Sequence, residues 1–267
     1  NMNNLIAVIN FCVGASIGSF INLIRYRIPK KESIFFPASY CDKCKKPLSF
    51  FQKVPIVSSL SISNECKFCG YRPHFEYGFI EIFSGSLFVL NIYEYKFSFS
   101  QFTLADYIFT CFFMTTLILI SLIDIDTLKI PNKIILYFYT IGILMILFSS
   151  VDFFSNLSVL VYRLGFSFLI FFSIEIFSIL YFSFRKKIPI GTGDTKLIST
   201  LTIWFGPIGA IISLVSSIYL AAGYIFYSFI RKKNIKPKFA FAPFLSLGAL
   251  LYLILGLKLN SIIFLNR

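Results

Sequence analysis

The sequence predicts an all-α polytopic membrane protein with about eight transmembrane helices and a small cysteine-containing loop domain between the first two. Three observations support this prediction. Of the 267 residues, 57% are hydrophobic and 19% are aromatic, and the mean hydropathy of +0.80 lies outside the range of soluble proteins. The apolar residues fall into runs near the length of about 20 residues that crosses a hydrocarbon core. One long polar segment, residues 25–78, contains two Cys-x2-Cys pairs.

The apolar runs set the order of the predicted helices. The run that begins near residue 199 is too long for one span, and Gly206-Pro207 offers a break because proline ends or kinks a helix. We therefore expect spans at residues 5–24, 79–93, 104–123, 134–149, 157–184, 195–205, 207–230 and 243–257. The chain then divides into a first transmembrane helix (1–24), a loop domain (25–78) and a membrane core (79–267).

The basic residues predict which side of the membrane each loop occupies. With eight spans, the loops 25–78, 124–133, 185–196 and 231–238 share one side and hold 10, 2, 4 and 5 lysine and arginine residues. Short loops rich in these residues stay in the cytoplasm, so we expect this side to be cytoplasmic. The net charge of +13 follows from this topology and from anionic lipid headgroups. We expect membrane lipids, and no nucleic acid, among the partners.

The loop domain carries four cysteines, Cys41, Cys44, Cys66 and Cys69. Each Cys-x2-Cys pair places two thiolates on one tight turn, and four thiolates form the tetrahedral set that Zn²⁺ prefers. Disulfide bonds are the alternative, which a reducing cytoplasm disfavours. A four-sulfur zinc site has no open position. We therefore expect the metal to stabilise a small zinc-ribbon-like domain and to take no part in catalysis.

Two acidic residues lie at the ends of apolar runs. Asp194 stands in Gly191-Thr192-Gly193-Asp194-Thr195-Lys196, just before an apolar run, where an acid is costly unless it is used or paired. Gly191 and Gly193 can take backbone angles closed to other residues and let another helix or a substrate strand approach closely. Asp124 ends another apolar run on the same predicted side of the membrane. The two acids therefore suggest a pair.

A pair of carboxyl groups points to peptide hydrolysis without a covalent intermediate. Two carboxylates held close together cannot both ionise cheaply, so one activates water while the other, protonated, polarises a carbonyl. Asp126 follows Asp124 by two residues, and on a helix their side chains point about 200° apart. Only one can face Asp194, and we favour Asp124 because it lies deeper in the apolar run. Glu81 is a secondary candidate.

Taken together, the motifs resemble the bacterial type IV prepilin peptidases, within the group of intramembrane aspartyl proteases marked by Gly-x-Gly-Asp. The resemblance covers nearly the whole chain. It rests on Gly18-Ser19-Phe20-x-Asn22 with Arg25-x-Arg27-x-Pro29; Pro37-x-Ser39-x-Cys41-x2-Cys44; Pro55-Ile56-x-Ser58; Cys66-x2-Cys69; Tyr77 with Glu81; Asp124-x6-Pro131-Asn132; Gly191-x-Gly193-Asp194-x-Lys196-Leu197; and Pro243-Phe244-Leu245. Presenilin-like proteases share Gly-x-Gly-Asp but pair it with Tyr-Asp, whereas Ile123 precedes the first acid here.

The resemblance implies a function. Asp124 and Asp194 would be the catalytic pair that removes the leader of prepilins and pseudopilins, just after a glycine, on the cytoplasmic side of the bacterial plasma membrane. Members of the family commonly also methylate the new N-terminus with S-adenosylmethionine. We assign Gly191, Gly193, Lys196 and Glu81 to the substrate and active-site loop, and Asn22 and Arg25 to cofactor binding.

The chain departs from the family pattern at three positions. Gly78 stands where proline is usual, Ala242 where glycine is usual, and Lys53 where asparagine is frequent. None of these positions is one of the two acids. The departures therefore affect the expectation of proteolysis little, and they leave methylation less sharply defined.

Two other classes of protein compete with the protease. A transporter would use the intramembrane acids to carry protons or cations, and it would favour acids near the bilayer midplane and repeated halves. A membrane-anchored docking module of a secretion or pilus machine would use the cysteine loop and leave Gly-x-Gly-Asp without a role. His74 is the only histidine, and no serine-hydrolase or zinc-hydrolase motif accompanies it.

Overall fold

The computed structural model of the chain describes residues 2–34, 75–97, 104–148, 153–186, 189–231 and 239–264, together with short stretches between residues 36 and 71. His74 and Lys53 lie outside the described residues. The chain forms two compact units, Asn1–Phe99 and Ser100–Arg267, and each is considered by itself.

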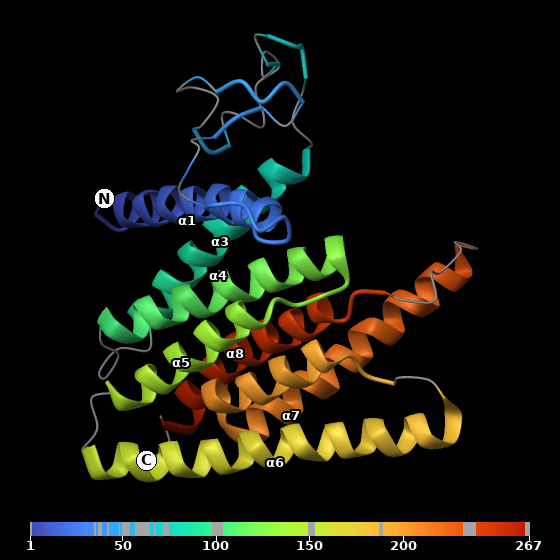
Figure 1. Cartoon of the computed structure of the whole chain (residues 1–267). Coiled ribbons are helices and arrows are strands. Elements are labelled where there is room, and N and C mark those ends of the chain that lie inside the picture. The colour runs from blue at the N-terminus through green and yellow to red at the C-terminus, as the bar shows by residue number, and fades with distance from the viewer. Residues whose placement is uncertain are drawn as a thin grey trace. The chain divides into compact units, whose positions relative to one another are not determined.

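The first unit is built on a helical hairpin of α1 (Met2–Arg27) and α3 (Phe75–Phe97) (Figure 1). The two helices pack antiparallel through glycines. A Cβ atom added to Gly14 would lie 2.8 Å from the Ser84 carbonyl oxygen, and one added to Gly18 would lie 2.8 Å from the Cα of Glu81. The absence of side chains at these two glycines therefore lets the helices pack closely.

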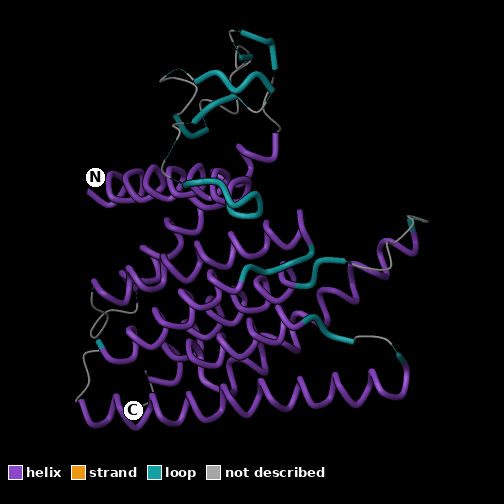
Figure 2. The backbone as a smooth tube through the Cα atoms, viewed as in Figure 1, coloured by secondary structure: helices purple, strands orange, loops and turns teal. Residues whose placement is uncertain are grey.

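Within its described residues the second unit contains five helices, labelled in Figure 1; Figure 2 draws all helices of the chain as purple coils. They are α4 (Leu104–Thr127), α5 (Asn132–Leu147), α6 (Phe153–Arg185), α7 (Thr192–Ile230) and α8 (Ala242–Phe264). Helix α7 contacts α5, α6 and α8, and α4 contacts α5 and α8. Among the described residues of the whole chain the only β interaction is an isolated bridge between Tyr40 and Pro47, so the expected all-α fold is confirmed.

Helix α7 is interrupted where the sequence predicts a break. Gly206 has φ 76° and ψ 175°, a conformation that glycine adopts readily, and Pro207 follows it. Because proline has no N–H, the Ile203 carbonyl loses its helical partner. The Arg163 side chain of α6 replaces it by donating to the carbonyl oxygens of Ile203 (2.8 Å) and Trp204 (2.9 Å). Counting the two parts of α7 separately, the described residues contain eight helical segments.

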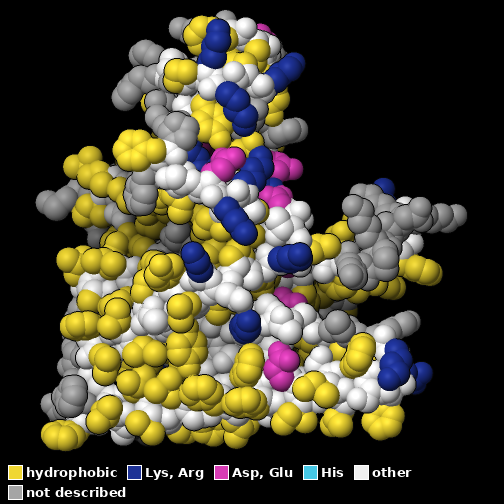
Figure 3. Space-filling model, viewed as in Figure 1, with side chains coloured by type: hydrophobic (Ala, Val, Ile, Leu, Met, Phe, Trp, Pro, Cys, Tyr) yellow, Lys and Arg dark blue, Asp and Glu magenta, His cyan; other side chains and the backbone are white. Residues whose placement is uncertain are grey.

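In the part of the chain that the structure describes, five helices are long and apolar enough to span a membrane: Asn3–Arg27, Phe75–Tyr93, Leu104–Thr127, Phe154–Arg185 and Thr192–Ile230. Asn132–Leu147 and Ala242–Leu255 are shorter apolar helices. Large hydrophobic side chains are exposed along α6, for example Phe168, Phe172 and Phe177, and in Figure 3 hydrophobic side chains cover much of the visible surface. A surface of this kind requires lipid around it. The chain is therefore a multi-pass membrane protein.

The helices extend beyond the apolar runs that predicted them. The predicted span 104–123 is α4, which continues through Asp124 and Asp126 to Thr127. The predicted span 243–257 begins at Ala242, and the span 195–205 begins at Thr192. Hydropathy marks only the apolar part of a helix, whereas hydrogen bonding continues into polar residues until a turn ends it. Both acids of the predicted pair therefore lie within helices.

An aromatic core joins the helices of the second unit. The Trp204 ring of α7 lies 5.0 Å from the Phe113 ring of α4 and 5.2 Å from the Phe138 ring of α5, measured between ring centroids. Its indole N–H donates to the Phe138 carbonyl oxygen at 3.1 Å. The Phe205 ring in turn lies 4.9 Å from that of Tyr252 on α8. This core fixes α4, α5, α7 and α8 relative to one another.

Candidate functional site

Asp124 occupies the last turn of α4 with its side chain turned into the second unit. It is 6% exposed, whereas Asp126 is exposed. The Ala242 backbone N–H, at the start of α8, donates to Asp124 Oδ2 at 3.1 Å. The difference between the two acids follows from helix geometry, since residues two apart project from different faces. Asp124 is therefore directed inward and Asp126 outward, as the sequence predicts.

Asp194 lies in the first turn of α7, which begins after Gly191. A Cβ atom added to Gly191 would lie 3.2 Å from Asp194 Oδ2, so the absence of a side chain leaves room for this carboxylate. Asp194 and Asp124 lie close enough for their charges to interact. Two carboxyl groups that are distant in the sequence and attached to different helices thus share one site.

The two glycines before Asp194 matter because they have no side chain, which leaves room for neighbouring atoms. Gly191 has φ −69° and ψ 141°, extended backbone that any residue adopts, so this position does not use the conformational freedom of glycine. A Cβ atom added to Gly193 would lie 3.3 Å from three side-chain atoms of Ile130, in the connection between α4 and α5. The steric reason therefore holds: glycine allows the start of α7 to approach the end of α4.

Lys196 connects the first part of α7 to the start of α5. Its ammonium group donates to Asn132 Oδ1, on the first residue of α5, at 2.8 Å. Asn132 and the Ala242 backbone were not among the expected site residues, although both sit beside prolines, Pro131 and Pro243. A proline beside the start of a helix was the signal in the sequence that could have indicated these two positions. The Ala242 contact is made by the backbone N–H, which alanine and glycine supply equally.

The four cysteines of the loop domain converge. Cys41 Sγ lies 3.7 Å from Cys69 Sγ, and Cys44 Sγ lies 3.6 Å from Cys66 Sγ. All four sulfurs lie within 4.8 Å of one another, and all four are free cysteines. A disulfide requires about 2.0 Å between sulfurs. A tetrahedral zinc site with bonds of about 2.3 Å places its sulfurs about 3.8 Å apart, so the arrangement fits this metal.

The two Cys-x2-Cys turns repeat one backbone pattern. Cys41 N–H donates to the Lys46 carbonyl and Lys45 N–H to the Cys41 carbonyl; likewise Cys66 N–H donates to the Tyr71 carbonyl and Gly70 N–H to that of Cys66. The fifth residue of each turn is left-handed, with φ 60° at Lys45 and 64° at Gly70. The Phe68 backbone N–H lowers the pKa of the Cys66 thiol, whereas at Cys69 the Tyr71 backbone N–H is outweighed by burial and by hydrogen bonds to the neighbouring thiols, which raise the pKa of that thiol. The thiols of the cluster therefore do not ionise independently of one another.

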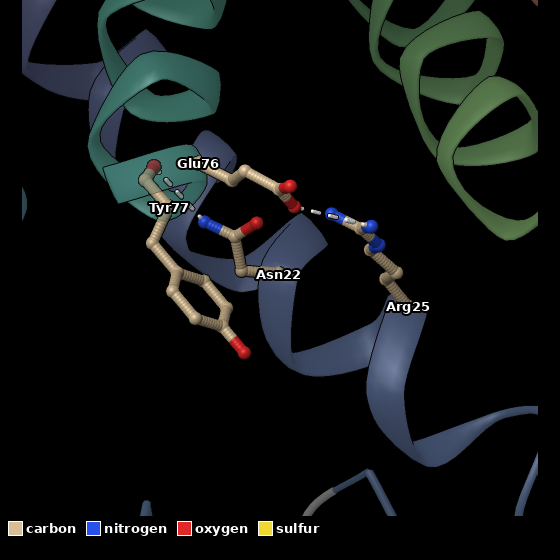
Figure 4. A network of polar contacts seen from close by, with 4 residues as sticks. All are labelled: Asn22, Arg25, Glu76 and Tyr77. Atoms are coloured by element: carbon tan, nitrogen blue, oxygen red, sulfur yellow. Dashed lines mark hydrogen bonds and ion pairs between the residues drawn. The ribbon is translucent and has the colours of Figure 1, made fainter. Parts of the chain in front are cut away.

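The remaining expected residues belong to the first unit. The Asn22 side-chain amide donates to the Tyr77 carbonyl oxygen at 3.2 Å, and Arg25 pairs with Glu76 at 3.6 Å (Figure 4). Glu81 is 2% exposed, and its Oε2 accepts from the Ile56 backbone N–H. Asn22 and Glu81 thus lie on facing helices of the hairpin, while Arg25 lies at its edge.

These observations describe a multi-pass membrane protein with two neighbouring carboxyl groups, on α4 and α7, and a cluster of four cysteines. Comparison with protein families identifies it further. Residues 12–95 match the bacterial peptidase A24 N-terminal domain, and residues 111–226 match the type IV leader peptidase family. The chain belongs to the type IV prepilin peptidase family, as its motifs indicate.

Curated relatives share one description, prepilin leader peptidase/N-methyltransferase. The relative from Neisseria gonorrhoeae is 29% identical over 218 residues, 73% of this chain and 72% of that protein. The one from Bacillus subtilis is 32% identical over 128 residues, 48% of this chain and 49% of that protein. The one from Legionella pneumophila is 26% identical over 266 residues, 90% and 88% of the two chains. No solved structure matches significantly. The transporter and docking-module alternatives are not favoured by these relatives.

Proposed function

We propose that this chain is an aspartyl endopeptidase that removes the leader peptide from type IV prepilins and pseudopilins, with Asp124 and Asp194 as its catalytic pair. The observation that carries the proposal is the interaction of these two carboxyl groups, brought together from α4 and α7 within a membrane protein. The family membership and the shared description of the relatives point to the same reaction.

The arrangement suits hydrolysis by a carboxyl pair. One carboxylate accepts a proton from a water molecule as the water oxygen attacks the scissile carbonyl carbon, while the other, protonated, donates to the carbonyl oxygen. The proton taken from water then passes to the leaving amine as the C–N bond breaks. Gly191, Gly193 and Lys196 position Asp194 for this chemistry by the contacts described above.

We further propose that the protein N-methylates the new N-terminus with S-adenosylmethionine, which supplies the methyl group. The family relatives carry this activity in their description. Asn22 and Arg25 of the first unit are the residues that we propose for the methyl donor, and Glu81 lies beside Asn22 on the facing helix. A structural zinc ion held by Cys41, Cys44, Cys66 and Cys69 would stabilise the loop domain.

The remaining assignments are proposals of the same kind. The active site faces the cytoplasm, where most basic loop residues of the predicted topology lie. The loop domain at residues 25–78 is separate from the first helix (1–24) and the membrane core (79–267). Membrane lipids surround the helices, and nucleic acid is not a partner.

A cleavage assay tests the central proposal. Purified, detergent-solubilised protein is mixed with a model prepilin, and the products are separated on a gel and identified by mass. We expect a single shorter product that begins after the leader. A transporter or a docking module would leave the prepilin intact under the same conditions, and that result would overturn the proposal.

A further inference from the structure

The α1–α3 hairpin contains a buried acceptor that none of the described residues satisfies. Asn22 is 6% exposed, and its Oδ1 atom has no hydrogen-bond partner among them. The orientation of this amide is set by its other end, because Nδ2 faces the Tyr77 carbonyl oxygen, which can only accept (Figure 4). A flipped amide would place two acceptors against each other. Asn22 Oδ1 is therefore a buried acceptor, and in Figure 4 it points away from the Tyr77 carbonyl.

A second unsatisfied group lies further along the hairpin. The Ser84 hydroxyl is fully buried and likewise lacks a partner among the described residues. A serine inside a helix ordinarily bonds to the carbonyl one turn earlier, as Ser86 does with Ile82 at 2.9 Å. Leaving a buried polar group unpaired costs stability, so a position that retains one is a candidate for ligand binding.

Glu81 lies between these two groups along α3. A Cβ atom added to Gly18 would lie 2.8 Å from the Cα of Glu81 and 3.1 Å from the Cβ of Ser84. Asn22 follows Gly18 by one turn of α1, so the three side chains occupy neighbouring turns of the packed helices. Glu81 also holds Ile56, a β-branched residue with φ 65°. Such a conformation is strained, and strain of this kind gathers at binding sites.

We propose that Asn22, Glu81 and Ser84 form a binding site for a protonated α-amino group. An ammonium group has three N–H donors and no acceptor, and it complements an amide oxygen, a carboxylate and a hydroxyl. Inside a membrane hairpin the carboxylate adds a charge that favours a cation. The site rests on the proposed methyltransferase function, because both reactants of that reaction carry such a group.

The α-amino group has two possible sources. One is the new N-terminus of the cleaved substrate, which is the atom to be methylated. The other is the amino-acid end of S-adenosylmethionine. The two sources share one chemistry at the site, and separate binding measurements distinguish them.

The test uses the full-length protein in detergent and measures binding directly. The Asn22→Leu variant removes the acceptor but also the hydrogen bond to Tyr77, so a loss of binding could reflect a loss of structure. Ser84→Ala breaks no hydrogen bond to the described residues and is therefore the decisive variant. Ser84 makes no hydrogen bond to the described residues, and its removal leaves the melting temperature of the ligand-free protein unchanged or higher. Ser86→Ala, on the same helix and exposed, is the matched control. The probes are S-adenosylmethionine and a product peptide with a free α-amine, each measured by equilibrium dialysis.

We expect Ser84→Ala to weaken one probe by about tenfold, the loss of one hydrogen bond to a charged group. Weaker S-adenosylmethionine binding assigns the site to the methyl donor, and weaker peptide binding assigns it to the substrate amine. In the second case an N-acetylated peptide should bind wild type as weakly as the variant. Unchanged binding of both probes would overturn the proposal. Prepilin cleavage, measured in parallel, should stay within twofold of wild type, so a failure here is separate from a failure of the proposed protease.

Discussion

Asp124 and Asp126 lie two residues apart on α4 but have different surroundings. Asp124 is buried and bonded to the start of α8, whereas Asp126 is exposed. We predict that Asp124→Asn and Asp194→Asn each abolish prepilin cleavage, because an amide cannot exchange the protons that hydrolysis requires. Asp126→Asn is the matched control and should keep most of the activity. Product formation on a gel is the measurement, with membrane insertion and melting temperature checked for each variant. Full activity in either of the first two variants would remove that residue from the catalytic pair.

Gly191, three residues before Asp194, allows a test of how the position of this carboxylate affects cleavage. Gly191→Ala meets no backbone restriction, but its methyl group would lie 3.2 Å from Asp194 Oδ2 and displace this carboxylate. We expect cleavage to fall roughly tenfold, since small displacements of reacting groups cost catalysis, while the melting temperature changes little.

Gly223→Ala is the control for the glycine test, because nothing lies within 4 Å of a Cβ atom there and alanine favours helix. This variant should be as active as wild type and equally stable or slightly more so. Equal activity of the two alanine variants would show that Gly191 does not make room for the acid.

At the scale of the helix, the break in α7 depends on a residue of α6. Arg163 donates to the carbonyls of Ile203 and Trp204, at the end of the part of α7 whose first turn contains Asp194. We predict that Arg163→Met lowers the free energy of unfolding by about 1–3 kcal/mol, because the carbonyls lose their partner inside the membrane. Thermal unfolding in detergent is the measurement. Arg185→Met, at the exposed end of the same helix, should change it little. Equal melting temperatures for the two variants would contradict the role of Arg163.

The cysteine module makes a separate prediction. Wild-type protein should contain one zinc ion per chain, and replacing both Cys41 and Cys44 by serine should remove it. We expect this double variant to lose methylation more than cleavage, since the module is connected directly to the α1–α3 hairpin. Elemental analysis and the two activity assays are the measurements, with Cys12→Ser as control because Cys12 lies outside the cluster. Wild type without zinc would disprove the metal site, and a zinc-free variant with both activities would show it to be dispensable.

For the whole molecule, the predicted property is the side of the membrane on which each loop lies. We predict that cysteines introduced at Lys31 and Lys129, both exposed, react only with reagent on the cytoplasmic side. A cysteine introduced at Phe154, 83% exposed near the start of α6, should react only from outside. Mass spectrometry locates the label and separates these sites from the native cysteines. Labelling of all three positions from one side would contradict both the eight-span topology and the cytoplasmic placement of the active site.

The membrane class, the order of the helices, the break at Gly206-Pro207 and the family were all predictable from sequence patterns. These features depend on local properties: the length of an apolar run, the missing N–H of a proline and the spacing of two cysteines. Such properties leave a direct trace in neighbouring residues. The opposite orientation of Asp124 and Asp126 was predictable for the same reason, because the angle between helical residues is fixed by the helix itself.

The partners of each predicted residue became known from the three-dimensional packing of the helices. Neither hydropathy nor motif spacing indicated that Ala242 donates to Asp124, that Lys196 reaches Asn132 or that Arg163 bonds to the broken part of α7. These contacts join residues far apart in the chain, and they depend on how the helices pack. The same holds for the unsatisfied atoms of Asn22 and Ser84, because an unpaired group can be identified only when all of its surroundings are known.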